Sequence, residues 1–118
     1  MTYLEYVKQY HKKACKRTVF YFDPPYLASG DNVYKGKWRE SDEIKFLEML
    51  DYLDSLNVKW VLSNVLAHRG LVNKILKKWQ KKYNVTYPAF RTSGEAYTIN
   101  RVYEAIKNET VEVLIKNF

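Results

Sequence analysis

The spacing of hydrophobic positions predicts a helix and then a strand in the first part of the chain. Thr2 and Glu5 have the spacing of a capping box, which marks the start of a helix. The side chains that follow recur on one helical face, at Tyr3, Tyr6, Val7, Tyr10 and Ala14. The segment 18–22 is β-branched and aromatic, which predicts a short buried strand. Pro24 and Pro25 end this strand, because proline has no N–H to donate to a sheet.

Two further helices and two further strands are predicted between Glu40 and Phe90. After a loop that reaches to about Glu40, Ser41 is expected to cap a helix with an acidic first turn. Its apolar face consists of Phe46, Leu47, Met49, Leu50, Leu53 and Leu56. The segment 58–62 predicts a second buried strand, which ends in Ser63-Asn64. A basic helix is predicted from about 70 to 82, with His68 and Arg69 at its start and Leu71, Val72, Ile75, Leu76 and Trp79 inward. The segment 85–90 is a strand that Pro88 confines to an edge or interrupts.

The order of these elements predicts an α/β fold in a single domain over residues 1–118. Residues 91–108 are expected to be loop, and 110–116 alternates apolar and charged side chains, as a final strand does. Strands separated by helices imply crossover connections and a mainly parallel sheet. The last strand has no helix before it, so it is expected to run antiparallel to its neighbour.

Composition narrows the class of protein. No apolar run approaches the roughly 20 residues that span a bilayer, so no membrane association is expected. One cysteine, Cys15, excludes an internal disulfide and favours a cytoplasmic location. Cys15 and His11 share a helix face, but two ligands do not make a metal site, and none is expected. The net charge of +7 is concentrated in lysines such as those of 74–82; these suit a polyanion such as DNA, or form a solvated helix face.

The tetrapeptide Asp23-Pro24-Pro25-Tyr26 is the strongest candidate site. It follows a strand of a parallel sheet, where ligands bind in such folds. The prolines fix the backbone, Asp23 and nearby carbonyls are acceptors, and Tyr26 offers a flat ring. This set suits a planar ligand with an amino group, although Asp-Pro and Pro-Tyr steps also occur in ordinary turns.

"VFYFDPPY" resembles the catalytic motif of amino-group DNA methyltransferases. With "WVLSNV", a basic helix and "EVLIKNF" after it, nearly the whole chain is similar to the C-terminal half of the Dam-like (D12) class of adenine-N6 DNA methyltransferases, including those of restriction–modification systems. The resemblance implies part of a class I, Rossmann-like S-adenosylmethionine-dependent methyltransferase sheet. It also implies that Asp23 and the Pro24 carbonyl accept the amino hydrogens of a flipped adenine, that Tyr26 stacks on the base, and that Asp23 lies beside S-adenosylmethionine.

Further residues are candidates for DNA contacts. Tyr34 and Trp38 follow the motif and can contact the flipped nucleotide or flanking DNA, or anchor the loop by packing. Arg91, Ser93 and Arg101 lie in a polar loop where the family places contacts to the DNA backbone. Ser63-Asn64 can line the pocket or simply end a strand.

The cofactor-binding glycine motif and the target-recognition region of the family are absent. The glycines at 30, 36, 70 and 94 are scattered. The chain is therefore expected to be the catalytic half of an enzyme, as a truncated frame, a fragment or a split subunit, and to bind S-adenosylmethionine weakly or not at all alone. The strand 18–22 would then have an unpaired edge, which predicts self-association or pairing with a separate N-terminal half.

Other functions remain open from the residues. The same acceptors serve methylation of cytosine N4 or of an RNA base, and the "EVLIKNF" tail argues for adenine by resemblance only. A nucleic-acid-binding remnant without catalysis is the alternative from another class; its DNA binding would be sensitive to salt and indifferent to Asp23→Ala.

Overall fold

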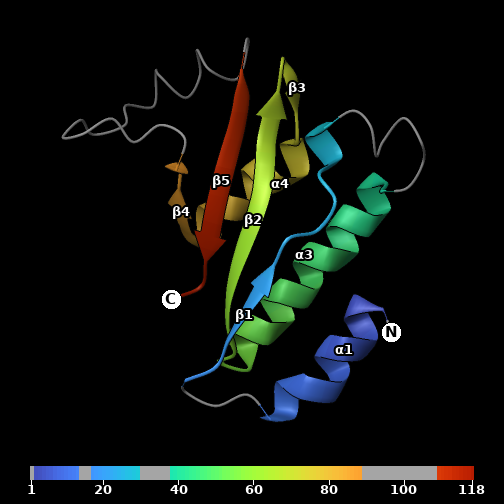
Figure 1. Cartoon of the computed structure of the whole chain (residues 1–118), viewed down its shortest axis with the longest axis vertical. Helices are drawn as coiled ribbons and strands as arrows, with labels where there is room; N and C mark the ends of the chain where they lie inside the picture. Colours follow the sequence, from blue (N-terminus) through green and yellow to red (C-terminus); the bar gives the residue numbers. More distant parts are fainter. Residues whose placement is uncertain (1, 14–16, 30–37, 89–108) are drawn as a thin grey trace, which may run out of the picture.

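The computed structural model describes residues 2–13, 17–29, 38–88 and 109–118. Figure 1 shows a twisted sheet with helices packed against it. The elements, labelled as in Figure 1, are α1 (Tyr3–Tyr10), η1 (His11–Lys13), β1 (Val19–Phe22), η2 (Leu27–Ser29), α3 (Glu40–Ser55), β2 (Lys59–His68), β3 (Leu71–Val72), α4 (Lys74–Trp79), η3 (Gln80–Lys82), β4 (Asn84–Thr86) and β5 (Thr110–Lys116).

The sheet is mixed, with the order β1-β2-β5-β4 and with β3 paired to β2. β1 and β2 pair in parallel, while β5 lies antiparallel to both β2 and β4. β1, β2 and β4 therefore share one direction, and β5 runs between two of them in the opposite direction (Figure 1). The prediction of an antiparallel last strand is confirmed, and so is the prediction of an α/β fold.

β2 is longer than the sequence pattern predicts. The strand was expected to end at Leu62, but the ladder with β5 continues from Val61↔Lys116 to His68↔Thr110. Ser63 and Asn64 therefore lie inside the strand, opposite Leu114 and Val113. Their polarity was mistaken for a strand end, because the partner that extends the ladder is about 50 residues away in sequence.

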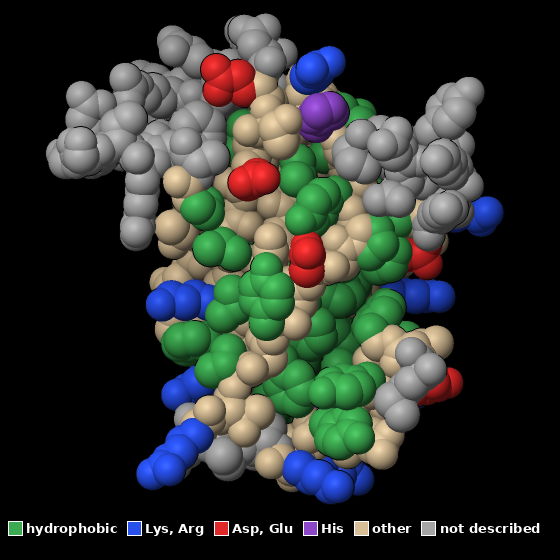
Figure 2. Space-filling model, in the orientation of Figure 1, with side chains coloured by type: hydrophobic (Ala, Val, Ile, Leu, Met, Phe, Trp, Pro, Cys, Tyr) green, Lys and Arg blue, Asp and Glu red, His purple; other side chains and the backbone are tan. Residues whose placement is uncertain are grey.

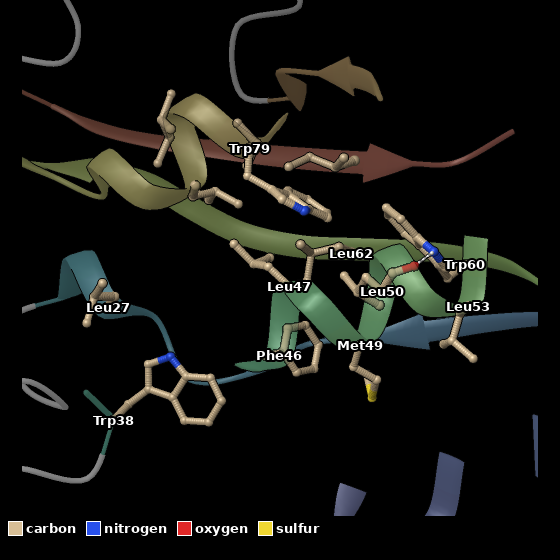
Figure 3. Packing of buried hydrophobic residues seen from close by; sticks show 14 of the residues in the cluster. Leu27, Trp38, Phe46, Leu47, Met49, Leu50, Leu53, Trp60, Leu62 and Trp79 are labelled. Atoms are coloured by element: carbon tan, nitrogen blue, oxygen red, sulfur yellow. Dashed lines mark hydrogen bonds between the residues drawn. The ribbon is translucent and has the colours of Figure 1, made fainter. Parts of the chain in front are cut away.

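One face of the sheet carries the core. Alternate residues of β2 and β5 point to α3 and α4, which pack together on this face (Figures 1 and 3). The buried set includes Phe46, Leu47, Leu50 and Leu53 of α3, Trp60, Leu62 and Leu66 of β2, Leu76 and Trp79 of α4, and Val111, Val113 and Ile115 of β5. α1 joins the same layer through Val7 and through the ring of Tyr3, which meets Phe46 edge-on at 5.3 Å.

The opposite face of the sheet is uncovered by helices in the described residues. Figure 2 shows a band of hydrophobic side chains there. Val19 and Tyr21 of β1 are 45% and 64% exposed. The prediction that this strand is buried is therefore wrong for the chain as described, since burial would require a second layer or a neighbouring strand.

The start of α1 is confirmed and the start of α3 is corrected. The side chains and backbones of Thr2 and Glu5 make both hydrogen bonds of the capping box. α3 begins at Glu40, with Arg39 rather than Ser41 at the N-cap. Asp42 takes the role of the acidic partner, because its Oδ2 accepts the Arg39 N–H at 2.9 Å. Two side chains predicted to lie on the apolar faces of these helices, Tyr6 of α1 and Leu56 after α3, are exposed.

The segment predicted as one helix over 70–82 is a turn, a short strand and a shorter helix. Arg69 and Gly70 adopt positive φ angles of 46° and 87°, which form a tight turn between β2 and β3. His68 and Arg69 therefore end a strand rather than begin a helix. Leu71 pairs in β3 and is exposed, and Asn73 caps α4 by accepting the Leu76 N–H at 2.9 Å.

The last two predicted strands differ in accuracy. β5 has the predicted bounds. β4 ends at Thr86, before Pro88, and lies at the edge of the described sheet, as predicted for a strand limited by proline. The loop predicted over 91–108 lies outside the described residues. None of the helices in the described part of the chain has the length and apolar character needed to cross a membrane.

Candidate active site

The tetrapeptide Asp23–Tyr26 forms an exposed corner at the carboxyl end of β1. Phe22, the last residue of β1, lies opposite Leu62 of β2. The chain then turns into η2, where Leu27 and Ala28 are buried against the body of the protein. The site thus lies where the sequence places it, at the edge of the sheet where ligands of α/β folds bind. Asp23 and Pro25 are exposed, and Pro24 and Tyr26 are half-buried.

Asp23 and Tyr26 are joined by a hydrogen bond. The Tyr26 hydroxyl donates to Asp23 Oδ1 at 2.8 Å. Burial and this bond raise the pKa of Tyr26 above its ordinary value of 10.0, while hydrogen bonding with Ser63 of β2 lowers it. The phenol is therefore protonated at neutral pH and acts as a donor to the carboxylate. Within the described residues Asp23 Oδ2 accepts no hydrogen bond, so one carboxylate oxygen stays open to a ligand.

Ser63 and Asn64, adjacent on β2, serve opposite faces of the sheet. Ser63 reaches Tyr26 on the uncovered side. Asn64 is buried on the helix side, where its Nδ2 donates to Glu43 Oε1 at 3.4 Å and its Oδ1 accepts the Val65 N–H at 2.7 Å. The prediction that this pair lies beside the motif is thus confirmed for Ser63, and Asn64 has a separate, internal role.

Glu43 is a functional candidate that the sequence analysis missed. Its side chain is 0% exposed and accepts three hydrogen bonds, from Trp38 Nε1 at 2.6 Å, from Asn73 Nδ2 at 3.0 Å and from Asn64. Burial raises its pKa above the ordinary value, and the three donors partly oppose that rise. A signal existed in the sequence: Glu43 stands three and four residues before Phe46 and Leu47, on the apolar face of α3.

Trp38 was predicted as a DNA contact or as a loop anchor, and its position fits the anchor. It is 7% exposed and packs against Phe46 and Tyr3. It also lines a pocket of about 460 Å³, together with Leu27, Arg39, Glu40, Leu71, Val72, Asn73, Lys74 and Ile75. Figure 3 shows Leu27 and Trp38 at one end of the core, far from Trp60 and Leu53. Because Leu27 lines the pocket and directly follows Tyr26, the pocket begins one residue after the motif.

The other predicted DNA contacts cannot be placed on this site. Tyr34, Arg91, Ser93 and Arg101 lie outside the described residues. Of the lysines in α4 and η3, Lys74, Lys78, Lys81 and Lys82 are exposed. No three His, Cys, Asp or Glu side chains among the described residues come together in an arrangement that could hold a metal ion.

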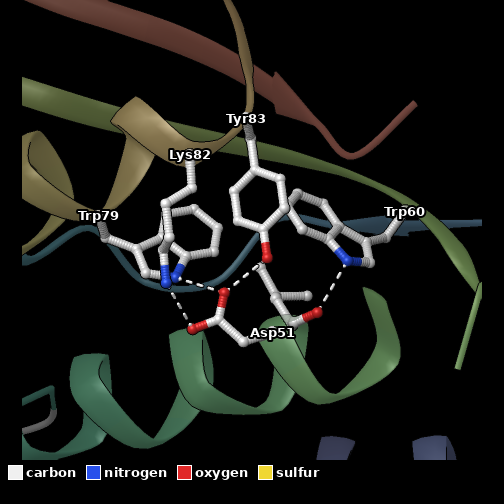
Figure 4. Close-up of polar contacts among 6 residues, drawn as sticks. Asp51, Trp60, Trp79, Lys82 and Tyr83 are labelled. Atoms are coloured by element: carbon white, nitrogen blue, oxygen red, sulfur yellow. Dashed lines mark hydrogen bonds and ion pairs between the residues drawn. The ribbon is translucent and has the colours of Figure 1, made fainter. Parts of the chain in front are cut away.

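A second polar cluster, around the half-buried Asp51, is structural. Asp51 Oδ1 accepts hydrogen bonds from Tyr83 at 2.6 Å and from Trp79 at 3.0 Å, and Oδ2 pairs with Lys82 at 3.0 Å (Figure 4). Trp60 stacks on Trp79 with ring centroids 5.7 Å apart. Burial and the Asp51 carboxylate raise the pKa of Tyr83. This cluster ties α3 to α4 and η3 at the end of the core away from the motif.

Comparison with known proteins identifies the family of the chain. The family model of D12 class N6 adenine-specific DNA methyltransferases matches residues 4–93, which include the motif, β2 and α4. The chain belongs to this family.

Three curated relatives are a type II methyltransferase and two modification methylases by name. The chain is 39% identical over 103 residues to the type II methyltransferase M.FokI of Planomicrobium okeanokoites, 35% over 107 residues to the modification methylase LlaI of Lactococcus lactis subsp. lactis, and 32% over 105 residues to the modification methylase StsI of Streptococcus sanguinis. These matches cover 83%, 86% and 83% of the chain but 15% of each relative. The chain thus spans about 15% of the length of the relatives it matches.

Proposed function

We propose that the chain is the catalytic part of a site-specific DNA adenine-N6 methyltransferase of a restriction–modification system, and that Asp23 to Tyr26 bind the target amino group. The observation that carries the proposal is the family match across an exposed Asp23–Tyr26 corner with an open carboxylate oxygen. The relatives named as methylases support the same class of reaction.

The chemistry of the corner follows from its hydrogen bonds. The lone pair of adenine N6 is delocalised into the ring, so the amino group is a poor nucleophile. Asp23 Oδ2 and the Pro24 carbonyl would accept its two hydrogens and localise electron density on the nitrogen. The Tyr26 ring would stack on the flipped base, which offsets part of the cost of extruding it. Positioning supplies the rate increase, and no covalent intermediate with the protein is needed.

The methyl group would come from S-adenosylmethionine, but the described residues do not form a full site for it. Gly70, the one glycine among them, lies in the turn after β2, so the described residues form no glycine-rich turn beside Asp23. Asp23 is the described residue nearest to where such a donor must present its methyl. We therefore propose that most of the cofactor site, and the region that reads the DNA sequence, belong to the rest of the methyltransferase. We also propose that the methyltransferase acts in the cytoplasm.

The edge of β1 is the proposed junction with that remainder. β1 is the first strand in the described sheet and pairs only with β2 there. Its free edge and the exposed Val19 and Tyr21 suit another strand, with a layer over the uncovered face. The partner is either a separate N-terminal half or a second copy of the chain. The class I, Rossmann-like architecture is part of this proposal, because a parallel neighbour at this edge would extend the described sheet in that way.

The test is methyl transfer by the complete methyltransferase that contains this chain. Asp23→Ala is expected to abolish incorporation of labelled methyl into DNA, because it removes the acceptor at the reacting nitrogen. Glu48→Gln is the matched control, since Glu48 is an exposed carboxylate on α3, on the helix side of the sheet and outside the motif. Full activity of Asp23→Ala would refute the catalytic role of the corner.

A non-catalytic nucleic-acid-binding remnant is the second candidate. The observation in its favour is the row of exposed lysines at 74, 78 and 81. Its sign would be salt-sensitive DNA binding with no methyl transfer by the wild-type methyltransferase, and with no effect of Asp23→Ala.

A further inference from the structure

We propose that Glu43 is a positioning residue, whose buried carboxylate fixes the walls of the pocket beside the motif so that this pocket receives the DNA strand next to the target adenine. The proposal rests on the proposed function for the identity of the ligand. Neither the family match nor the names of the relatives assign a role to Glu43 or to this pocket.

Among the described residues, the Glu43 carboxylate has no cationic partner. Glu43 is fully buried, and its described partners are three neutral N–H donors rather than a cation. A buried carboxylate without a cation is costly, and an apolar side chain at this core position would be cheaper for stability alone. The carboxylate instead fixes the positions of the side chains that donate to it, because each oxygen accepts hydrogen bonds from defined directions.

The donors come from three separate segments, and two of them form the pocket. Trp38 precedes α3, Asn64 lies in β2, and Asn73 is the N-cap of α4. Trp38 and Asn73 line the pocket of about 460 Å³. Asn73 is itself fixed, since its N–H donates to the Leu66 carbonyl at 2.8 Å and its Oδ1 caps α4. The hydrogen bonds to Glu43 thus hold the Trp38 side of the pocket in place relative to β2 and α4.

The pocket is connected to the motif and has the chemistry of a nucleotide site. Leu27, which follows Tyr26 directly, forms part of its wall. Val72 and Ile75 add apolar surface for a base or sugar, and exposed Arg39 and Lys74 stand at the rim, where a phosphate would lie. Glu40 is also at the rim, so the local excess of positive charge is small, and we expect apolar contact to supply much of the affinity.

The functional test compares two carboxylate-to-amide variants on the same helix in the complete methyltransferase. Glu43→Gln places an NH₂ group against the N–H donors around it and so disrupts this group of hydrogen bonds, which we call the Glu43 hub. Asp51→Asn disturbs the Asp51 cluster at the far end of the core. Both are assayed at a temperature where circular dichroism shows them folded. For Glu43→Gln we expect the KM for DNA to rise about fivefold or more while the KM for S-adenosylmethionine stays unchanged. For Asp51→Asn we expect both constants to stay near the wild-type values.

A spectroscopic test on the 118-residue chain does not depend on methyl transfer. The chain has three tryptophans, and their indole N–H groups donate to the Glu43 carboxylate, to the Leu50 carbonyl (Trp60) and to Asp51 (Trp79). In a ¹⁵N-labelled sample, the Trp38 indole signal is expected to move as Glu43 gains a proton on acidification, while the Trp60 signal, whose acceptor cannot titrate, stays in place. Tyr3 is the further ionisable side chain that senses Glu43, and it stays neutral over that range.

The outcomes separate the two proposals. If the wild-type methyltransferase transfers methyl groups but Glu43→Gln and Asp51→Asn change the KM for DNA equally, the positioning role is wrong and Glu43 is structural. If the wild type transfers none, the proposed function fails, while the titration of Trp38 still tests the hub. Should Glu43→Gln not fold, Trp38→Phe replaces it, because this change removes the indole donor and keeps an aromatic ring; an unchanged KM for DNA in Trp38→Phe would likewise overturn the proposal.

Discussion

The hydroxyl of Tyr26 donates a hydrogen bond to Oδ1 of Asp23 across a distance of 2.8 Å. This bond occupies Oδ1, while Oδ2 accepts no hydrogen bond from the described residues. The tyrosine of the motif therefore has two separable parts: a ring that can stack on a base and a hydroxyl that orients the carboxylate beside it.

Tyr26→Phe separates these parts. The ring remains for stacking, but the carboxylate loses its orienting donor, so we expect kcat of the complete methyltransferase to fall about tenfold with little change in the KM for DNA. Steady-state kinetics with labelled S-adenosylmethionine measure both constants. Tyr26→Ala removes both parts and is expected to raise the KM as well. A wild-type kcat in Tyr26→Phe would show that the hydroxyl contributes nothing.

Glu43 should make stability depend on pH in a defined direction. Its pKa in the folded chain lies above the ordinary value of 4.5, because burial disfavours the charged form. The folded state therefore holds the proton more tightly than the unfolded state. The contribution of Glu43 to the free energy of unfolding is greatest below pH 4.5, falls as the pH rises through the folded-state pKa, and is constant above it.

Urea unfolding of the wild type and of Glu43→Gln at a series of pH values measures this contribution. The difference in unfolding free energy, wild type minus variant, should decrease as the pH rises above about 4.5. A difference that is flat from pH 4 to pH 7 would mean that the carboxylate has the same pKa in both states.

Asn117 should be the most sensitive residue of the C-terminal segment. Its Oδ1 accepts the Trp60 N–H at 2.8 Å, and its Nδ2 donates to the Val58 carbonyl at 2.9 Å and to Asp54 Oδ1 at 3.1 Å. Asn117→Ala is expected to cost about 1–3 kcal/mol in thermal or urea unfolding, since it leaves partly buried groups without partners. Asn84→Ala, which removes one exposed bond to the Phe118 carbonyl, is the control and should cost less.

Association through the β1 side can be tested on the chain alone. We expect the wild-type chain to self-associate in light scattering at high concentration, and Tyr21→Lys to reduce this by placing a charge on the exposed strand. Tyr52→Lys changes a similarly exposed tyrosine on α3 and should leave association unchanged. A monodisperse wild-type monomer would exclude self-association and leave a separate polypeptide as the candidate partner.

Local signals in the sequence predicted the elements that local interactions determine. The capping box of Thr2 and Glu5, the alternation over 110–116 and the turn chemistry of Pro24-Pro25 each act within a few residues, and each is found where expected. The position of the candidate site could be predicted for the same reason, because a strand end is a local feature. The family resemblance predicted from the motif is confirmed by the family match.

Features that depend on distant partners were not predictable from the pattern. The extension of β2 past Leu62 requires β5, and the split of the segment 70–82 requires that β3 pair with β2 and that Asn73 meet Glu43. Glutamate is normally a surface residue. Glu43 can be buried only because Trp38, Asn64 and Asn73, from three other segments, donate hydrogen bonds to its carboxylate. Exposure of β1 was missed because apolar strands are normally covered on both faces in parallel sheets.

In the described residues, helices cover only one side of the sheet, which would have a consequence in the cell. A partner that binds only the folded state stabilises that state by an amount that grows with the logarithm of the partner concentration. The lifetime of this chain in a cell would therefore depend on the concentration of the partner that covers Val19 and Tyr21. Copies made in excess of that partner would be the first to meet proteases and chaperones. The amount of active protein would then be limited by assembly rather than by synthesis of this chain.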